Sequence, residues 1–571
     1  MLQLPIGYDN FRDLIDKDLD FVDKSLFIRE VLDDRVTSVV LITRPRRFGK
    51  TLNLSMLHYF LAAEAYGQST EGLFDGLQIM AQGEAYTQHH RKYPVLFLTF
   101  KDVKDGGFQI AYDKLYELII SLYDQFNYLQ RSDRLTENQR QLYQIVLQRK
   151  ANRVQIENSL KVLTECLFAH HGVKPWLLID EYDTPIQSAY VHGYYEEMMS
   201  LMRGMLSSAL KTNPYLNRAV ITGILRVSKE SLFSGLNNLK VYSMLQSKYG
   251  SYFGFTENEI ENLLQRAGLQ SQAKTIKDWY NGYLSGETVL YNPWSIANCI
   301  QEQGLIKPYW TNTSDDLLIK KILTRSGFEF KEQFERLMQG EPTEQVIDEN
   351  VVFAELKGGS NAWSLLLMAG YLKVTEQHQA GDGLMCQLTI PNQEVRNRYQ
   401  QITKQWLSNG HGIEWFNRFL ENLLTGKLDR FEEDLTQIME ETVSVHDTAN
   451  DPEAFYHGLM IGLTASLYGN KNYLLKSNHE SGYGRYDYLI LSKDPKRPTL
   501  LLELKRVKAN AGENSTKLLQ QLETAAQEAL QQIEQQSYSA EVQQQGVTHL
   551  IKIGLAFCGK RFKLKAIEAQ S

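Results

Sequence analysis

Residues 37–51 of the chain read TSVVLITRPRRFGKT, and this stretch decides the fold. Its first seven residues are mostly apolar and rich in β-branched side chains, which is typical of a strand buried on both faces. A helical pattern follows over residues 49–63. A loop between a buried strand and a helix can hold phosphate on backbone N–H groups and on the helix N-terminus. The stretch therefore predicts a phosphate-binding strand–loop–helix unit.

The rest of the first half repeats this alternation of strand and helix. Apolar runs typical of buried strands occur at residues 94–100 (PVLFLTF), 175–180 (PWLLID) and 218–223 (RAVITG). Helical patterns lie at residues 113–150, 156–170 and 194–211. Strands that alternate with helices favour a parallel α/β sheet with both faces covered. We therefore predict an α/β core of the P-loop NTPase type over residues 1–255.

The loop residues have the chemistry that a nucleotide site needs. Lys50 would reach the β- and γ-phosphates of ATP, and the Thr51 hydroxyl would coordinate Mg²⁺. Gly49 and the backbone around Arg46 and Arg47 would hold the phosphates. The loop departs from the general GxxxxGK[ST] pattern, because Arg44 stands where the first glycine belongs.

A second motif, LLIDEYD at residues 177–183, places acids at the end of a predicted strand. Asp180 would hold Mg²⁺, directly or through water, and Glu181 would polarise the attacking water. In open α/β sheets the carboxyl ends of the strands line the ligand crevice, so both motifs are expected to meet there. Thr222 could be a sensor hydroxyl near the γ-phosphate, and Arg226 a second sensor or a phosphate ligand. A plain structural role stays open for both.

The pattern changes after residue 255. Residues 256–405 show many helical segments and few strands, which predicts a helical lid, with a winged-helix-like part as one option. We expect connecting helices over residues 406–450. The polar stretch HDTANDPE at residues 446–453 marks the boundary to a compact α/β domain over residues 451–571.

This last domain carries a pattern of charged residues on two predicted strands. Asp487 lies in RYDYLI (485–490), and Glu503 and Lys505 lie in LLLELK (500–505). A hairpin of these strands would bring Asp487 beside Glu503, and two neighbouring carboxylates bind Mg²⁺ or Mn²⁺. Lys505 would orient the nucleophile or offset developing charge. Glu453 could add a carboxylate; solvated charges flanking a strand are the alternative.

The first half resembles a known family. LPIGYDNFRDLI, FVDKSLFI, RPRRFGKTLNLSML, LLIDEYDTPI and ITGILRVSKESLFSGLNNL, over roughly residues 4–260, are similar to the AAA-ATPase-like family found in many bacterial genomes. That family has an Arg-Pro-Arg-Arg-x-Gly-Lys loop, so Arg44 matches it. The resemblance implies ATP binding, and it implies ATP hydrolysis less directly.

The C-terminal stretch has its own resemblance. FYHGL, GYGRYDYLI, LLLELK and GLAFCGK, over about residues 452–562, resemble the PD-(D/E)xK nuclease domain, which has a restriction-endonuclease-like fold. The resemblance implies that Asp487 and Glu503 are metal ligands and that Lys505 is catalytic. It adds Glu453 and Gln532 as weaker candidates.

Composition limits the partners and the compartment. The 571 residues carry 61 Lys and Arg against 68 Asp and Glu, a net charge of −7, so contact with nucleic acid requires a local basic patch. The N-terminal residues lack the pattern of a signal peptide, and no apolar run approaches the ~18 residues of a membrane span. The four scattered cysteines show no zinc spacing. We expect a cytoplasmic protein without a membrane partner.

Three functions are compatible with these patterns. The first is a nucleotide-gated, metal-dependent nuclease acting on DNA or RNA. The second is a nucleotide-switched signalling or interaction ATPase whose nuclease-like domain binds nucleic acid without cutting it. The third is an ATP-driven ring, which requires a homo-oligomer.

Overall fold

The computed structural model describes residues 2–227, 232, 237–310, 322, 328–351, 360–380, 383–408, 413–442, 467, 472–481, 484–507, 515–535, 547, 549–558 and 561–570. The chain divides into two compact units. The first comprises Met1–Thr313, Glu344–Leu356 and Ser360–Val395, and the second comprises Ser314–Thr343, Lys357–Gly359 and Arg396–Ser571.

A five-stranded sheet organises the first unit. Its strand order is β4-β5-β6-β1-β8, and the neighbours pair in parallel. The strands are β4 (Val95–Thr99), β5 (Trp176–Asp180), β6 (Arg218–Gly223), β1 (Val39–Thr43) and β8 (Leu239–Tyr242). The parallel α/β core predicted from the sequence is thus confirmed, and the four predicted strands are all present. β8 is an additional strand at the edge of the sheet.

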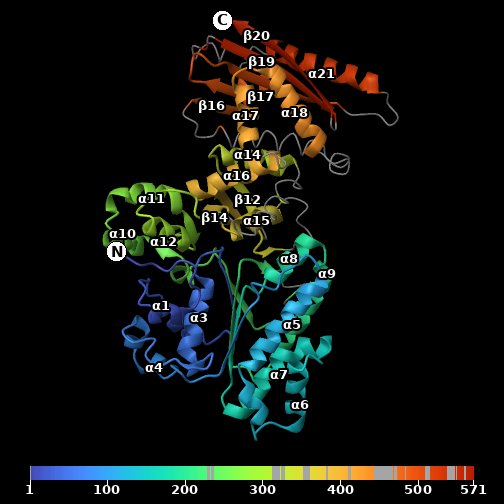
Figure 1. The fold of residues 1–571 in the computed structure, drawn as a ribbon. Coiled ribbons are helices and arrows are strands. Elements are labelled where there is room, and N and C mark those ends of the chain that lie inside the picture. Colours follow the sequence, from blue (N-terminus) through green and yellow to red (C-terminus); the bar gives the residue numbers. More distant parts are fainter. Residues whose placement is uncertain are drawn as a thin grey trace. The chain divides into compact units, whose positions relative to one another are not determined.

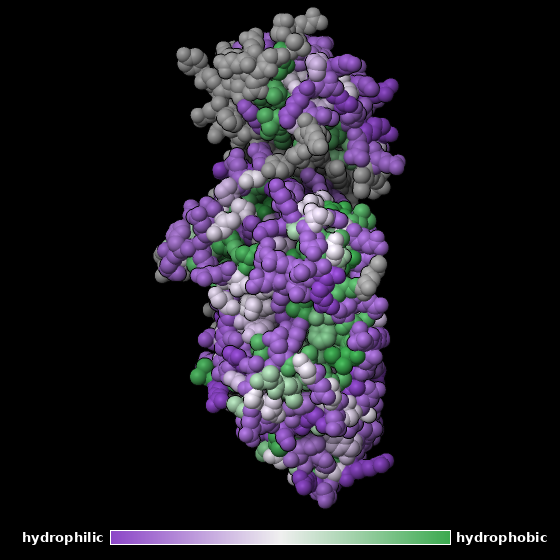
Figure 2. Space-filling view, turned by 90° about the vertical axis from the view of Figure 1, so that its left-hand side faces the viewer, coloured by the Kyte–Doolittle hydropathy of each residue, from purple (hydrophilic) through white to green (hydrophobic). Residues whose placement is uncertain are grey.

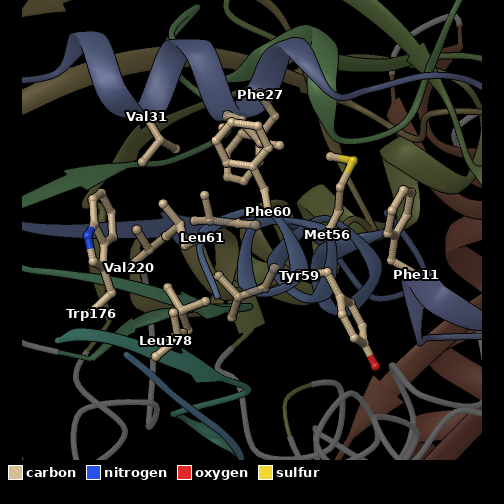
Figure 3. Close-up of a cluster of buried hydrophobic side chains, with 14 of the residues drawn as sticks. Phe11, Phe27, Val31, Met56, Tyr59, Phe60, Leu61, Trp176, Leu178 and Val220 are labelled. Atoms are coloured by element: carbon tan, nitrogen blue, oxygen red, sulfur yellow. The ribbon is translucent and has the colours of Figure 1, made fainter. Parts of the chain in front are cut away.

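Helices cover both faces of this sheet (Figure 1). One face carries α1 (Phe11–Asp16), α2 (Leu26–Asp33) and α3 (Lys50–Leu61); the other carries α5 (Phe108–Asp124), α7 (Arg153–His171) and α9 (Tyr195–Leu210). Figure 3 shows Phe60 and Leu61 of α3 packed toward Leu178 and Val220 of the sheet. Because side chains alternate along a strand, this packing leaves Leu177 and Ile179 for the opposite layer. The helical pattern over 113–150 is divided between α5 and α6 (Glu137–Leu147).

The region expected as a helical lid contains strands as well as helices. Its helices include α10 (Glu257–Ala267), α11 (Ala273–Tyr280), α12 (Pro293–Gln301) and α15 (Ser360–Met368). One small sheet joins β9 (Phe255–Thr256), β10 (Tyr283–Ser285) and β11 (Thr288–Tyr291). Another joins β12 (Thr343–Ile347), β14 (Lys373–Ala380) and β15 (Gly383–Thr389). Helix α16 (Gln393–Ser408) carries the chain from the first unit into the second.

The second unit is built on a mixed sheet. Its strands, in spatial order, are β16 (Tyr473–Ser481), β17 (Gly484–Ser492), β18 (Thr499–Arg506), β19 (His549–Cys558) and β20 (Arg561–Gln570). β18 and β19 are parallel and the other neighbours are antiparallel. This arrangement confirms the predicted α/β class of the C-terminal domain, with β20 as a strand that was not predicted.

The two faces of this mixed sheet have separate cores. Leu501 and Leu489 pack against Leu530 and Ile533 of α21 (Ser515–Gln535). Leu500, Leu502 and Ile490 face the other way, toward aromatic residues of α17 (Ile413–Leu424) and α18 (Leu428–Thr442), namely Phe416, Phe419 and Phe431. These two helices, expected as connectors, therefore belong to the hydrophobic core of this unit. The helix expected over residues 452–467 lies outside the described residues, except for Leu467.

Polar side chains dominate the face of the molecule seen in Figure 2, with hydrophobic ones gathered in smaller areas. Among the helices that the structure describes, none combines the length and apolar character needed to cross a membrane.

Candidate functional sites

The loop between β1 and α3 has a backbone suited to an anion. Gly49 caps α3 with a φ of +78°, and Arg47 has a φ of +67°. Left-handed residues near a helix N-terminus turn successive N–H groups toward one concavity, which favours phosphate. Glycine takes this conformation without strain, whereas Arg47 takes it against the preference of a residue with a Cβ.

Lys50 is folded back onto this loop. Its side chain is buried, and Nζ donates hydrogen bonds to the carbonyl oxygens of Arg44 (3.0 Å) and Pro45 (2.9 Å). Burial lowers the pKa of Lys50, while the charges of Glu181 and Asp180 raise it. The amine thus sits within the loop that would hold the phosphates.

Asp180 accepts hydrogen bonds from three threonine hydroxyl groups. Its carboxylate accepts hydrogen bonds from Thr51 (2.7 Å), Thr222 (2.6 Å) and Thr99 (3.3 Å). Thr99 and Thr222 come from the strands on either side of β5, and Thr51 comes from the first turn of α3. Burial and the neighbouring Glu181 raise the pKa of Asp180, and the hydrogen bonds from Thr222 and Thr51 lower it.

This geometry brings the two sequence motifs together. A threonine hydroxyl and an aspartate carboxylate in contact beside a lysine provide oxygen ligands of the kind that Mg²⁺ prefers. The residues present therefore fit a magnesium–nucleotide complex. Glu181 has a φ of +51° and accepts a hydrogen bond from the Thr184 hydroxyl (3.2 Å), which holds its carboxylate near the end of β5.

Two arginines predicted as ligands have different surroundings. The Arg47 guanidinium lies 4.1 Å from the centre of the Trp294 ring, which belongs to α12. Arg226 belongs to β7 (Arg226–Val227), which pairs in parallel with β13 (Asn350–Val351). Arg46 lies between Pro45 and Arg47 and is half-buried.

The second candidate site lies in the C-terminal unit. Glu503 is only 4% exposed although it is charged. Lys505 Nζ donates to Glu503 Oε1 (3.1 Å) and also to Gln532 Oε1 on α21. The structure therefore brings three of the predicted residues into one cluster.

A glycine explains how α21 comes so close. Gly554 of β19 pairs with Glu503 of β18, and a Cβ on Gly554 would lie 3.0 Å from the Leu530 nitrogen and closer still to the Ala526 carbonyl oxygen. Both obstacles are backbone atoms of α21. The helix therefore packs directly on the strand beside Glu503, and this approach carries Gln532 to Lys505.

Asp487 belongs to β17, the strand that pairs with β18. Tyr488 pairs with Leu502 and Leu489 with Leu501 in an antiparallel register. Asp487 directly precedes Tyr488 and Glu503 directly follows Leu502 in the sequence. That the two carboxylates meet stays a prediction. Glu453 lies outside the described residues. Within the part of the chain that the structure covers, no cluster of three or more His, Cys, Asp or Glu residues could hold a metal ion.

Comparison with known proteins gives a family match for the N-terminal part of the chain and another for the C-terminal part. Residues 5–233 match the family model described as predicted AAA-ATPase, and residues 451–567 match that of the PD-(D/E)XK nuclease superfamily. The chain combines an AAA-ATPase-like domain with a PD-(D/E)XK nuclease superfamily domain. It is also 28% identical over 398 residues to an uncharacterized protein in the vnfD 5′ region of Azotobacter chroococcum mcd 1, covering 69% of this chain and 68% of that protein. These domain families indicate ATPase and nuclease activity.

The structure explains why the loop has Arg44 in place of the first glycine of the general pattern. The Arg44 guanidinium is fully buried and donates to the carbonyl oxygens of Thr43 (2.7 Å), Tyr242 (3.0 Å) and Lys248 (3.4 Å). Burial lowers the pKa of Arg44 to about 9, so it stays charged at neutral pH. Where other loops have glycine, this domain uses an arginine to tie β1 to the end of β8.

Sequence reasoning missed the role of a third acid in the AAA-ATPase-like domain, Asp183. Asp183 is 1% exposed, and its Oδ2 accepts hydrogen bonds from the backbone N–H groups of Ile224 (3.0 Å) and Leu225 (2.9 Å). Burial raises the pKa of Asp183 to about 6. This carboxylate fastens the segment after β6, which leads to Arg226, to the end of β5. The third acidic position of DEYD was the sequence signal for this residue.

Proposed function

We propose that this chain binds and hydrolyses ATP, and that its C-terminal domain cleaves phosphodiester bonds of DNA or RNA with a divalent metal ion under control of the nucleotide. The observation that carries the ATP part is the contact between the Thr51 hydroxyl and the Asp180 carboxylate, 2.7 Å apart, beside Lys50. This is the ligand pair that a magnesium–nucleotide complex requires at the end of a parallel strand.

Each residue of the first site has a role in this proposal. The backbone of residues 46–50 and the N-terminus of α3 would hold the phosphates, with Lys50 on the β- and γ-phosphates. Thr51 and Asp180 would hold Mg²⁺, which supplies charge neutralisation when bound. Glu181 would orient the attacking water. Thr222 keeps the Asp180 carboxylate in place, and Arg46, Arg47 and Arg226 would add positive charge near the phosphates.

The second site would act on a phosphodiester. Glu503 and Asp487 would be the ligands of Mg²⁺ or Mn²⁺, with Glu453 as a further candidate. Leu489 and Leu501 lie on the face of the sheet that is covered by α21, the helix that also carries Gln532. Lys505, held between Glu503 and Gln532, would offset the charge that develops on the phosphate.

Nucleotide binding is tested by replacing Lys50. Lys50→Ala should weaken ATP binding, measured by calorimetry, by at least about 10-fold, because one buried charge-assisted contact is lost. Lys114→Ala is the matched control, since Lys114 is a partly exposed lysine of the same unit that pairs with Asp105. Wild-type affinity in Lys50→Ala would contradict the proposal.

Cleavage is tested on a panel of single- and double-stranded DNA and RNA with Mg²⁺ or Mn²⁺, with and without ATP. Glu503→Gln and Asp487→Asn should each lower the cleavage rate by at least about 100-fold while nucleic acid still binds. Glu523→Gln, on the outer part of α21 against Lys565, is the control. Cleavage that persists in both variants would remove the assigned site. Binding without cleavage in the wild type would favour the nucleotide-switched interaction ATPase, and the mass of the protein in solution with ATP tests the homo-oligomer.

A further inference from the structure

A buried carboxylate outside both sites joins three segments. Glu394, in the first turn of α16, is 1% exposed. It accepts hydrogen bonds from the Ser295 hydroxyl (2.8 and 3.0 Å) and from the Trp310 backbone N–H (2.9 Å). Burial raises the pKa of Glu394 to about 7. Because a buried carboxylate needs such donors, Glu394 fixes the start of α16 to α12 and to the segment that follows it.

The same helix α12 contacts the phosphate loop. Trp294, the neighbour of Ser295, lies under the Arg47 guanidinium at 4.1 Å. The Trp294 indole N–H also donates to the Tyr309 carbonyl oxygen (3.0 Å), next to Trp310. One residue of α12 thus touches the phosphate loop, and the next residue holds Glu394.

The residues of α16 that follow Glu394 belong to the second unit from Arg396 onward. The first unit ends at Val395 and the second continues from Arg396, both within α16. In the second unit Arg396 donates to the Met338 carbonyl oxygen (2.6 Å), and the Tyr399 ring packs edge-on against Phe334 at 4.9 Å. Both partners lie in α14 (Phe328–Met338). Within the second unit, α16 is therefore fastened to α14 through Arg396 and Tyr399.

We propose that Arg47, Trp294 and Glu394 couple nucleotide binding to the first turn of α16. This inference rests on the proposed nucleotide binding and names the residues through which that binding would reach α16. Phosphate would draw Arg47 away from Trp294, because a charge-assisted bond to phosphate is stronger than a cation–π contact at a partly exposed site. Freed from Arg47, Trp294 would let α12 shift, and Glu394 would move the first turn of α16 with it. Rigid helices with two arrangements can carry such coupling.

Hydrogen exchange of α16 tests the coupling without relying on cleavage. We expect Mg²⁺ with a non-hydrolysable ATP analogue to change amide exchange over residues 393–402 of the wild-type chain by at least about 5-fold, the lower end of typical coupling. Trp294→Leu and Glu394→Ala should each abolish this change while the analogue still binds within about 3-fold of the wild-type affinity. Trp279→Leu is the matched control, because Trp279 is a partly buried tryptophan on α11 in the same hydrophobic cluster. This variant should keep the response.

Two results would overturn the inference. One is wild-type exchange over residues 393–402 that does not respond to the bound analogue. The other is an equal response in the wild type, Trp294→Leu and Glu394→Ala. Failure of the proposed function gives a different result, because the wild-type chain would then not bind the analogue, or would not cleave any nucleic acid. If Glu394→Ala does not fold, Trp294→Leu carries the test.

Discussion

The hydrogen bond from Thr222 to Asp180 allows a direct test of whether Asp180 is charged in the folded protein. Thr222→Val keeps the shape of a buried side chain and removes the 2.6 Å hydrogen bond to the Asp180 carboxylate. A hydrogen bond to a charged group contributes about 1.5–3 kcal/mol to stability. For a domain of this size, each kcal/mol corresponds to about 2–4 °C, so the melting temperature of the AAA-ATPase-like domain should fall by about 3–12 °C.

Thr70→Val provides the comparison. Thr70 is equally buried, and its hydroxyl donates to the neutral carbonyl oxygens of Ala62 and Ala63. A neutral hydrogen bond contributes about 0.5–1.5 kcal/mol, which gives a decrease of about 1–6 °C. The assay is thermal unfolding of both variants and the wild type over a range of pH.

The pH dependence separates the two variants. Burial raises the pKa of Asp180 in the folded state, and the Thr222 hydrogen bond opposes that rise. Without this hydrogen bond the pKa of Asp180 rises further. The loss in Thr222→Val should therefore be complete above the pKa of Asp180 in the variant, and should shrink as the pH falls from there through the wild-type pKa. The loss in Thr70→Val should not change with Asp180. Equal losses with the same pH dependence would refute the idea that Asp180 is a charged group held by its hydroxyl neighbours.

Three further predictions concern other parts of the chain. Gly554→Ala should destabilise the C-terminal domain by about 1–3 kcal/mol in a denaturant titration, because its Cβ meets backbone atoms of α21; Gly106→Ala, with open space around it, should not. Asp183 has a raised pKa in the folded state, so the wild type gains stability when this buried carboxylate is protonated as the pH falls from about 7 to about 4. An asparagine at this position cannot be protonated, so Asp183→Asn should become less stable relative to the wild type over this range, by about 3 kcal/mol in total. A pH-independent difference would contradict this reasoning. Phe48→Ala should cost about 3–5 kcal/mol and weaken ATP binding, since the buried ring packs edge-on against Tyr283 at 4.9 Å and holds the phosphate loop. Calorimetry and thermal unfolding measure both effects, and unchanged values would show that the ring does not hold the loop.

The strands that could be predicted share one property. The runs that became β1, β4, β5 and β6 are continuous and apolar, because these strands are covered on both faces. β8 escaped prediction because Leu239–Tyr242 is short and lies at the edge of its sheet. β20 was not predicted because Arg561–Gln570 is rich in charged residues. Such residues are common on edge strands like β20, but they do not identify a strand in the sequence.

The site residues divide in a similar way. The close approach of Lys50, Thr51 and Asp180 could be predicted because each residue is tied to a fixed place, the end of a strand or the start of a helix. Their roles toward a nucleotide stay a prediction. The role of Arg44 could not, because its partners Tyr242 and Lys248 are about 200 residues away in the chain. Glu394 likewise finds its donors 84 and 99 residues away. Long-range contacts of single side chains leave no periodic trace in the sequence.

The folded-back position of Lys50 has a consequence for how a nucleotide would enter. Its ammonium group already donates to two carbonyl oxygens of the loop, and the Thr51 hydroxyl already donates to Asp180. A triphosphate would have to exchange these internal bonds for its own instead of adding new ones. Breaking the internal bonds cancels part of the attraction between the phosphates and the side chains of Lys50 and Thr51. Adenosine has no phosphate to replace these bonds, so the exchange of bonds would determine how strongly the loop prefers ATP to adenosine.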